Sequence, residues 1–245
     1  MDTLSEKDFG EVKAFGTTLW GLAVALVASN VFAIIYILAE NVTSTTTLST
    51  GELIVSSIGV YLGFFGAPLL IARRQNRRFA DLFHISFKAV DLLIGVVVGV
   101  GLQLAVIPLL YLPLEALSPS IKTAISQPAQ RLTSSAHGFT VDTLIVGLIL
   151  VGFSPLFEEI FFRGLAWQSL RNYKISNNVL RAVVVNGGSA ALFAAAHFEP
   201  LQTLGLFVVG LVFAVMRYRF NRLGPTIVAH AAFNFITFAS MAKIF

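Results

Sequence analysis

The chain has 245 residues, of which 56% are hydrophobic and only 12% are charged, and its mean hydropathy is +0.80. Soluble domains carry about 25% charged residues, so this chain has too little polar surface for a water-soluble globule. The absence of cysteine excludes disulfides, thiolate zinc sites and a cysteine nucleophile. The net charge of +4 comes from short basic clusters between apolar runs, so nucleic acid is not a predicted partner.

Seven apolar runs follow one another along the chain, and about 20 apolar residues suffice for one membrane crossing. The runs are Ala14–Ala39, Leu53–Ala72, Leu92–Leu112, Val141–Gln168, Val179–Phe198, Leu201–Met216 and Gly224–Phe245. The sequence therefore predicts an all-α fold, a polytopic transmembrane helix bundle of about seven helices embedded in a lipid bilayer.

The basic residues predict the orientation of this bundle. If the seven runs alternate in direction, one side of the membrane receives only Lys122, Arg131 and Lys243 of the 17 Lys and Arg residues. Basic loops stay in the cytoplasm. We therefore expect a multi-pass protein of the plasma (cytoplasmic) membrane, with its N-terminus in the cytoplasm and its C-terminus outside.

The distribution of intramembrane charge divides the chain in two. Residues 1–140 hold three charge-poor helices and an outer loop, which predicts an N-terminal scaffold, and 141–245 hold a four-helix core with nearly all of the intramembrane charge. The prolines of the outer stretch Pro113–Thr140 predict a solvated loop or a partly interfacial segment. Gly95 and Gly99 form a GxxxG pattern that favours close helix packing.

Ionisable side chains at membrane depth are costly, so each is a functional candidate. The first group is Glu158, Glu159 and Arg163, within the fourth run. On a helix, Arg163 can neutralise Glu159 one turn away, whereas Glu158 points about 100° aside and lacks that partner. Glu158 is therefore the candidate general base. The alternative is that both acids pair with Arg163 at the membrane boundary.

Two further groups supply imidazoles and an amide. His197 ends the fifth run, and His230 and Asn234 stand four residues apart on one face of the last run. A single histidine at a helix end is more often an interfacial residue than a catalytic one, and the other pair could bond to neighbouring helices. Together, however, the three groups suit peptide hydrolysis.

In that reaction, Glu158 would deprotonate a water that His197 orients, and His230 with Asn234 would donate hydrogen bonds to the oxyanion. No cofactor is then required. A zinc ion held by Glu158, His197 and His230 is the alternative. We rank it second because the chain has no H-E-x-x-H motif and Asn is an unusual zinc ligand.

At these residues the sequence resembles the CPBP family of intramembrane proteases, also called Abi or type II CAAX prenyl endopeptidases. The resemblance lies in E-E-x-x-x-R (Glu158 to Arg163), F-x-x-x-H (Phe193 to His197) and H-x-x-x-N (His230 to Asn234), in that order on separate hydrophobic helices. It covers roughly 154–238. It implies a glutamic-type intramembrane endopeptidase, in which Glu159, Arg163 and Phe193 support the four catalytic residues.

The family also implies the partners. Its eukaryotic members remove the last three residues of prenylated CAAX proteins, and many bacterial members are linked to bacteriocin immunity or peptide maturation. We therefore expect a hydrophobic or lipidated peptide as substrate, and the sequence does not specify whether that peptide is prenylated. A non-proteolytic scaffold or immunity protein that binds such peptides is an alternative function, and a small transporter is a weaker one because the chain lacks internal repeats.

Strict alternation of straight helices places Glu158 and His230 toward the cytoplasm but His197 toward the outside. Pro155, just before Glu158, can kink or shift the fourth helix, which is also longer than one bilayer core. We therefore expect Glu158 near mid-depth, in a polar, water-filled cavity among the fourth, fifth and seventh helices that opens to the cytoplasm.

Overall fold

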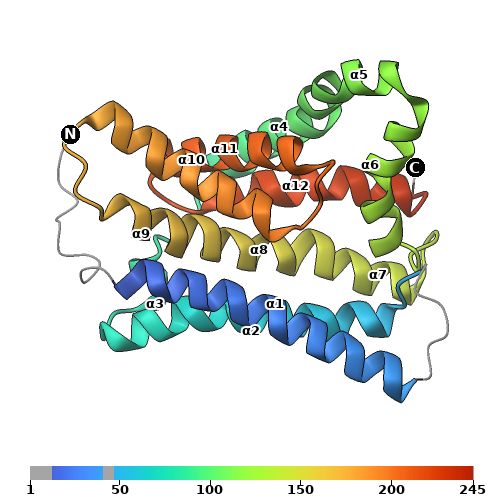
Figure 1. Ribbon diagram of the computed structural model, residues 1–245, viewed down its shortest axis with the longest axis horizontal. Coiled ribbons are helices and arrows are strands. Elements are labelled where there is room, and N and C mark those ends of the chain that lie inside the picture. The colour runs from blue at the N-terminus through green and yellow to red at the C-terminus, as the bar shows by residue number, and fades with distance from the viewer. Residues whose placement is uncertain (1–12, 41–46, 245) are drawn as a thin grey trace.

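The computed structural model describes residues 13–40 and 47–244, which are 82% helical and contain no strand. Three stretches, labelled η, are π-helical. The elements in chain order are α1 (Lys13–Ala39), α2 (Thr50–Arg74), α3 (Phe79–Leu82), α4 (Ala89–Gly101), η1 (Leu102–Val106), α5 (Ile107–Leu117), α6 (Pro119–Leu132), α7 (Val141–Gly147), η2 (Leu148–Phe153), α8 (Ser154–Glu159), η3 (Ile160–Ala166), α9 (Trp167–Arg171), α10 (Asn178–Ala196), α11 (Thr203–Phe220) and α12 (Gly224–Met241). Most of them run along the long axis of the molecule (Figure 1).

Within residues 13–40 and 47–244, six helical segments are long and apolar enough to cross a membrane, which confirms a multi-pass, all-α membrane protein. They are Phe15–Ala39, Thr50–Arg74, Ala89–Leu117, Val141–Arg171, Asn178–Ala196 and Thr203–Phe220. The seventh predicted crossing is α12. It has 18 residues and runs beside α4 and η2, but it is not among these six segments.

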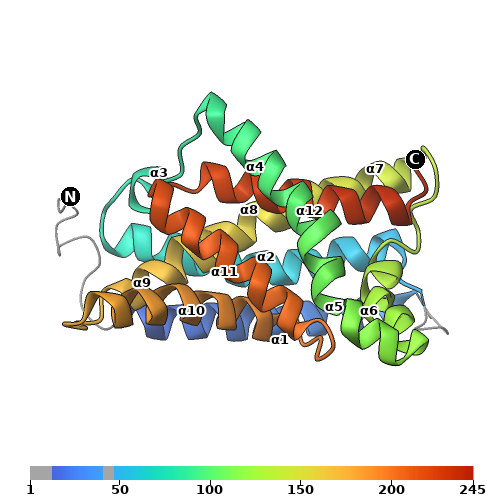
Figure 2. The same ribbon diagram turned by 90° about the horizontal axis from the view of Figure 1, so that it is seen from above.

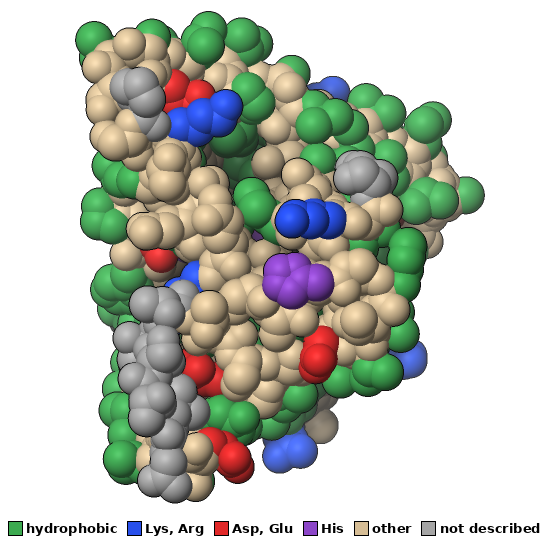
Figure 3. Space-filling model, turned by 90° about the vertical axis from the view of Figure 1, so that its right-hand side faces the viewer, with side chains coloured by type: hydrophobic (Ala, Val, Ile, Leu, Met, Phe, Trp, Pro, Cys, Tyr) green, Lys and Arg blue, Asp and Glu red, His purple; other side chains and the backbone are tan. Residues whose placement is uncertain are grey.

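The sides of the bundle are hydrophobic and its end is polar. Large apolar side chains such as Leu38, Leu93 and Val97 are more than half exposed, as expected for helices that face lipid. Figure 3 looks onto the end of the bundle where α12 finishes, and shows hydrophobic side chains around the rim with polar atoms and a few charges of both signs across the middle. This distribution fits a bundle with lipid at its sides and water at its end.

The long helix that carries Glu158 and Glu159 is continuous from Val141 to Arg171, but it contains two π-helical stretches, η2 and η3. The wider turn η2 ends two residues before Pro155, and η1 likewise ends two residues before Pro108. Proline has no N–H for the preceding turn and its ring crowds the carbonyl four residues back, so a locally wider turn lets the helix continue. Pro155 thus accompanies a change of winding before Glu158, as its position predicted.

Residues 113–140 differ from one of the two alternatives predicted for them, a solvated loop. The expected loop is largely helical: α5 continues to Leu117, and α6 follows after one residue. The backbone N–H of Gly205 donates to the Tyr111 hydroxyl (2.9 Å), and the Gln202 amide donates to the carbonyl of Ile125 (2.6 Å). The turn between α10 and α11 therefore rests on α5 and α6, and it stops short of the end of the bundle that α12 reaches (Figures 1 and 2).

Close packing of α4 on α12 confirms the prediction from the GxxxG pattern. A Cβ atom at Gly99 would overlap the backbone carbonyl of Ala229, and one at Gly95 would overlap the side chain of Val228. Ala229 precedes His230, so the contact at Gly99 holds the stretch of α12 that carries this imidazole.

We predict that Gly99→Ala forces α12 away from α4, at a cost of about 1–3 kcal/mol for overpacking. Thermal unfolding in detergent measures the loss. Gly101→Ala is the matched control, because a Cβ atom there meets nothing within 4 Å. Equal unfolding temperatures for the two variants would contradict the role of Gly99.

Candidate active site

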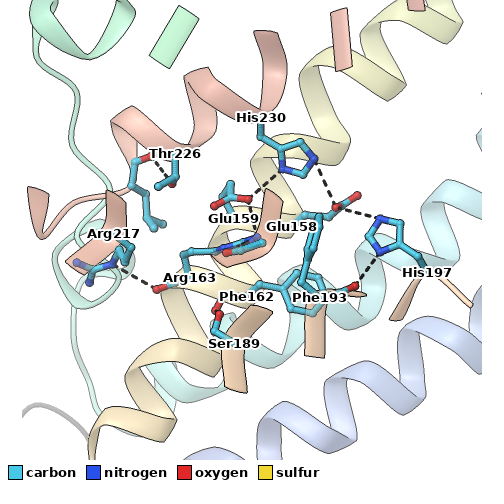
Figure 4. A network of polar contacts seen from close by, with 12 residues as sticks. Glu158, Glu159, Phe162, Arg163, Ser189, Phe193, His197, Arg217, Thr226 and His230 are labelled. Carbon is cyan, nitrogen blue, oxygen red and sulfur yellow. Dashed lines mark hydrogen bonds and ion pairs between the residues drawn. The ribbon is translucent and has the colours of Figure 1, made fainter. Parts of the chain in front are cut away.

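A fully buried ion pair forms the base of the site. The side chains of Glu159 and Arg163 have no exposed surface, and Nη1 of Arg163 donates to Oε1 of Glu159 at 2.8 Å. The pairing across one helical turn is confirmed. Oε1 also lies 3.0 Å from Nδ1 of His230, so α12 is tied to α8 through the same carboxylate (Figure 4).

The guanidinium of Arg163 is enclosed by two further helices. Nη2 donates to the carbonyl of Gly210 at 3.0 Å, and the group lies over the rings of Phe193 (4.5 Å) and Phe213 (5.3 Å). Aromatic faces attract cations, so α10 and α11 compensate for the water that the guanidinium has lost. Phe193, predicted as a supporting residue, is thus part of this cage.

Side chains from other helices also bind the backbone of η3. The Ser189 hydroxyl donates to the carbonyl of Phe162 (2.9 Å), and Nε of Arg217 donates to the carbonyl of Arg163 (3.3 Å). Arg217 is only 1% exposed. From the sequence, Arg217 was interpreted only as one of the basic residues that indicate orientation, so its bond to the backbone of η3 was not predicted. Its one signal was a basic residue four positions before Asn221, which accepts a hydrogen bond from it at 2.9 Å.

Glu158 faces the two histidines. Its Oε2 lies 4.0 Å from Nε2 of His197 and 3.8 Å from Nε2 of His230. This oxygen is buried and has no hydrogen-bond partner among the described residues. Three helices far apart in sequence thus bring one carboxylate oxygen and two imidazole nitrogens together (Figure 4). The separation from His197 is within the reach of one bridging water, which joint activation of water requires.

Hydrogen bonds at the other ring nitrogens orient both imidazoles. Nδ1 of His197 lies 2.8 Å from the carbonyl of Phe193, and a carbonyl only accepts, so Nδ1 carries the proton. Nε2 of the neutral ring then has a lone pair that faces Glu158. The bond from Nδ1 of His230 to Glu159 likewise leaves Nε2 of His230 facing Glu158.

Asn234 has a different partner from His230. Its Nδ2 donates to the carbonyl of Leu150 at 2.8 Å, in the π-helical turn η2. Within the described residues, His230 therefore contacts a carboxylate and Asn234 binds backbone one turn farther along, so each of the two polar groups of α12 has its own partner. The second N–H of the Asn234 amide is left for another acceptor.

The positions of the helices account for the expected conflict in depth. Glu158 lies about 26 Å from the start and about 20 Å from the end of the long helix, at 1.5 Å per residue. His197 follows the last residue of α10, whose turn into α11 stops short of the bundle end (Figure 1). A long helix and a short hairpin therefore bring the two side chains to the same level.

We predict that Arg163→Met sharply lowers the yield and thermal stability of the protein, because it leaves the Glu159 carboxylate buried without its cation. Removal of one partner from a buried pair costs about 3–5 kcal/mol. Size-exclusion chromatography and thermal unfolding in detergent provide the measurement. Arg78→Met removes an exposed ion pair with Asp81 and serves as the control, since it should unfold like the wild type.

Comparison with known proteins gives one match. Residues 140–236 match the family model described as type II CAAX prenyl endopeptidase Rce1-like, and this range includes Glu158, His197, His230 and Asn234. No curated protein and no solved structure matches the chain. The family implies protease activity of the CAAX type. The chain is therefore an integral, multi-pass membrane protein whose residues 140–236 are similar to the type II CAAX prenyl endopeptidase Rce1-like family.

Proposed function

We propose that the protein is a glutamic-type intramembrane endopeptidase in which Glu158 activates the water that cleaves the peptide. One observation carries this proposal: Oε2 of Glu158 is buried, has no hydrogen-bond partner among the described residues and faces Nε2 of both histidines. A buried carboxylate oxygen without a partner is costly, and a water between it and His197 removes that cost.

A water molecule about 2.8 Å from both Oε2 of Glu158 and Nε2 of His197 fits the 4.0 Å gap between these atoms. Both atoms accept hydrogen bonds, so the two hydrogens of the water point at them and its oxygen lone pairs point into the cavity. When the oxygen attacks the carbonyl carbon, one proton passes to Glu158. The carboxyl group then returns this proton to the leaving nitrogen as the C–N bond breaks.

The developing oxyanion needs donors on the opposite side of the carbonyl. Asn234 has one N–H beyond the one that binds Leu150. His230 donates through Nε2 when the ring carries both protons, and its contact with Glu159 compensates the positive charge. Arg163 and Phe193 act through this network by holding Glu159 and the histidines in place.

The cavity and the orientation in the membrane belong to the same proposal. The connections from α2 to α4, from α9 to α10 and from α11 to α12 lie at one end of the bundle (Figure 1). They carry basic residues such as Arg77, Lys174 and Arg222, which supports a cytoplasmic location for that end. The predicted cytoplasmic N-terminus lies outside the described residues. We propose the plasma membrane as the location, a cavity that opens to the cytoplasm, and 141–245 as the catalytic core beside a 1–140 scaffold.

Zinc-dependent hydrolysis is the second candidate, because Glu158 offers one oxygen, and His197 and His230 offer two nitrogens that face it. The Nδ1–H groups of both imidazoles are bound to acceptors, as is usual for zinc ligands. Tetrahedral bonds of 2.0–2.1 Å, however, place neighbouring ligand atoms about 3.3 Å apart. The observed separations of 3.8 and 4.0 Å are longer and favour a bridging water.

We expect Glu158→Gln to lower kcat on a prenylated CAAX peptide about 100-fold or more, because the amide cannot accept the proton of water. The assay uses purified protein in liposomes, with thermal unfolding as a check on the fold. Glu115→Gln, on α5, is the control. Cleavage by the Glu158→Gln chain at the wild-type rate would exclude the glutamic mechanism. Retained biological function without cleavage would favour a non-proteolytic, peptide-binding protein.

Chelation separates the two hydrolytic mechanisms. The metal-free mechanism predicts that cleavage in liposomes is unchanged after incubation with 1,10-phenanthroline, because no step uses a Lewis acid. Loss of cleavage that added zinc restores would instead establish the zinc mechanism. The non-chelating isomer 1,7-phenanthroline controls for effects of the compound on the membrane.

A further inference from the structure

A pair of hydroxyl groups lies beside Glu158, and one of them comes from the N-terminal half of the chain. The Tyr61 hydroxyl of α2 is 3.0 Å from Oγ of Ser154 on α8, and the ring of Tyr61 packs on Phe157 with centroids 4.5 Å apart. Ser57, one turn earlier on α2, approaches the same hydroxyl. Tyr61 lies outside the segment that matches the family.

The pair is close to the reacting carboxylate. Ser154 and Glu158 are four residues apart within α8, so their side chains point the same way with Cβ atoms about 5–6 Å apart. Tyr61 contacts this part of α8 through the Ser154 hydroxyl and the ring of Phe157. Tyr61 is half-buried.

A further polar contact lies earlier along the long helix. Four residues before Ser154, the carbonyl of Leu150 binds Asn234 of α12. Figure 1 shows α8 between α12 and α2, and both helices contact it. The oxyanion donors thus come from one side of α8 and the Tyr61 hydroxyl from the other, with Glu158 between them.

A peptide in this site needs more hydrogen bonds than the reaction itself provides. Glu158, His197, His230 and Asn234 account for the water and the scissile carbonyl. The neighbouring backbone groups of an extended peptide follow at about 3.3 Å per residue, and each of them is costly to leave without a partner away from water. The hydroxyls of Tyr61 and Ser154 are donors and acceptors about one helical turn from Glu158.

We infer that Tyr61 and Ser154 form a backbone-binding subsite, which hydrogen-bonds the substrate residue next to the scissile bond and positions that bond at Glu158. The inference rests on the proposed function. It makes α2, and not only the 141–245 core, part of the substrate site. It also assigns Tyr61 to substrate binding and not to proton transfer.

Equilibrium binding tests the subsite without requiring cleavage. In the Glu158→Gln background, the affinity of a fluorescein-labelled, prenylated CAAX peptide is measured by fluorescence anisotropy in detergent micelles. Adding Tyr61→Phe should raise Kd about 3- to 10-fold, the effect of one hydrogen bond, because phenylalanine keeps the packing on Phe157. In the otherwise wild-type chain, Tyr61→Phe should raise KM similarly and change kcat less than about twofold.

Matched controls separate binding from stability. Tyr111→Phe removes a hydroxyl that accepts from the backbone of Gly205, away from Glu158, and should lower the unfolding temperature without changing Kd. Ser154→Ala should raise Kd, whereas Ser56→Ala should not, since the Ser56 hydroxyl bonds to its own helix.

Several results would overturn the inference. An unchanged Kd for Tyr61→Phe would leave the hydroxyl as a contact between α2 and α8 only, and a fall in kcat at constant KM would make it part of the chemistry. Failure of the labelled peptide to bind the Glu158→Gln chain would leave the subsite without a ligand. Full cleavage by Glu158→Gln would refute the proposed mechanism alone, because the comparison of Kd values does not depend on it.

Discussion

Glu159 and Arg163 are neutralised by each other inside the bundle, where neither has any contact with water. An unpaired charge at this depth is costly, so every helix that touches the pair is constrained by it. Three helices contact the pair: α11 through Gly210 and Phe213, α10 through Phe193, and α12 through His230. The neighbouring Glu158 gains a fixed frame because its own helix is held on three sides.

The two adjacent glutamates differ because a helix turns by about 100° per residue. Glu159 points into the packed interior, where its Oε1 contacts both Arg163 and His230. Glu158 instead faces Nε2 of both histidines at 3.8–4.0 Å. Each glutamate keeps its Oε2 without a hydrogen-bond partner among the described residues. One residue therefore stabilises the structure and the next is available for chemistry. The same division appears in the imidazoles, since each uses Nδ1 for orientation and presents Nε2 to the site.

Irregular winding of the long helix is a second condition for this geometry. π-helical turns lie on both sides of α8, one before Pro155 and one that contains Arg163. They change the face that each segment presents, and their backbone carbonyls accept bonds from Asn234, Ser189 and Arg217. Such turns are frequent at functional sites. The side chains of three other helices are thus attached directly to the backbone of the helix that carries both glutamates.

Hydrophobicity along the chain determined the membrane class, the positions of the helices and the Glu159–Arg163 pair, because these depend on composition and on the helical repeat alone. It did not reveal the helix α6, whose Pro128 and polar residues resemble a loop. The meeting of Glu158 with His197 depended on a short α10–α11 hairpin resting on α5 and α6, and the approach of Tyr61 depended on α2 packing against α8. Only the tertiary structure decided these contacts, because they join residues far apart in sequence and no local pattern encodes which helices become neighbours.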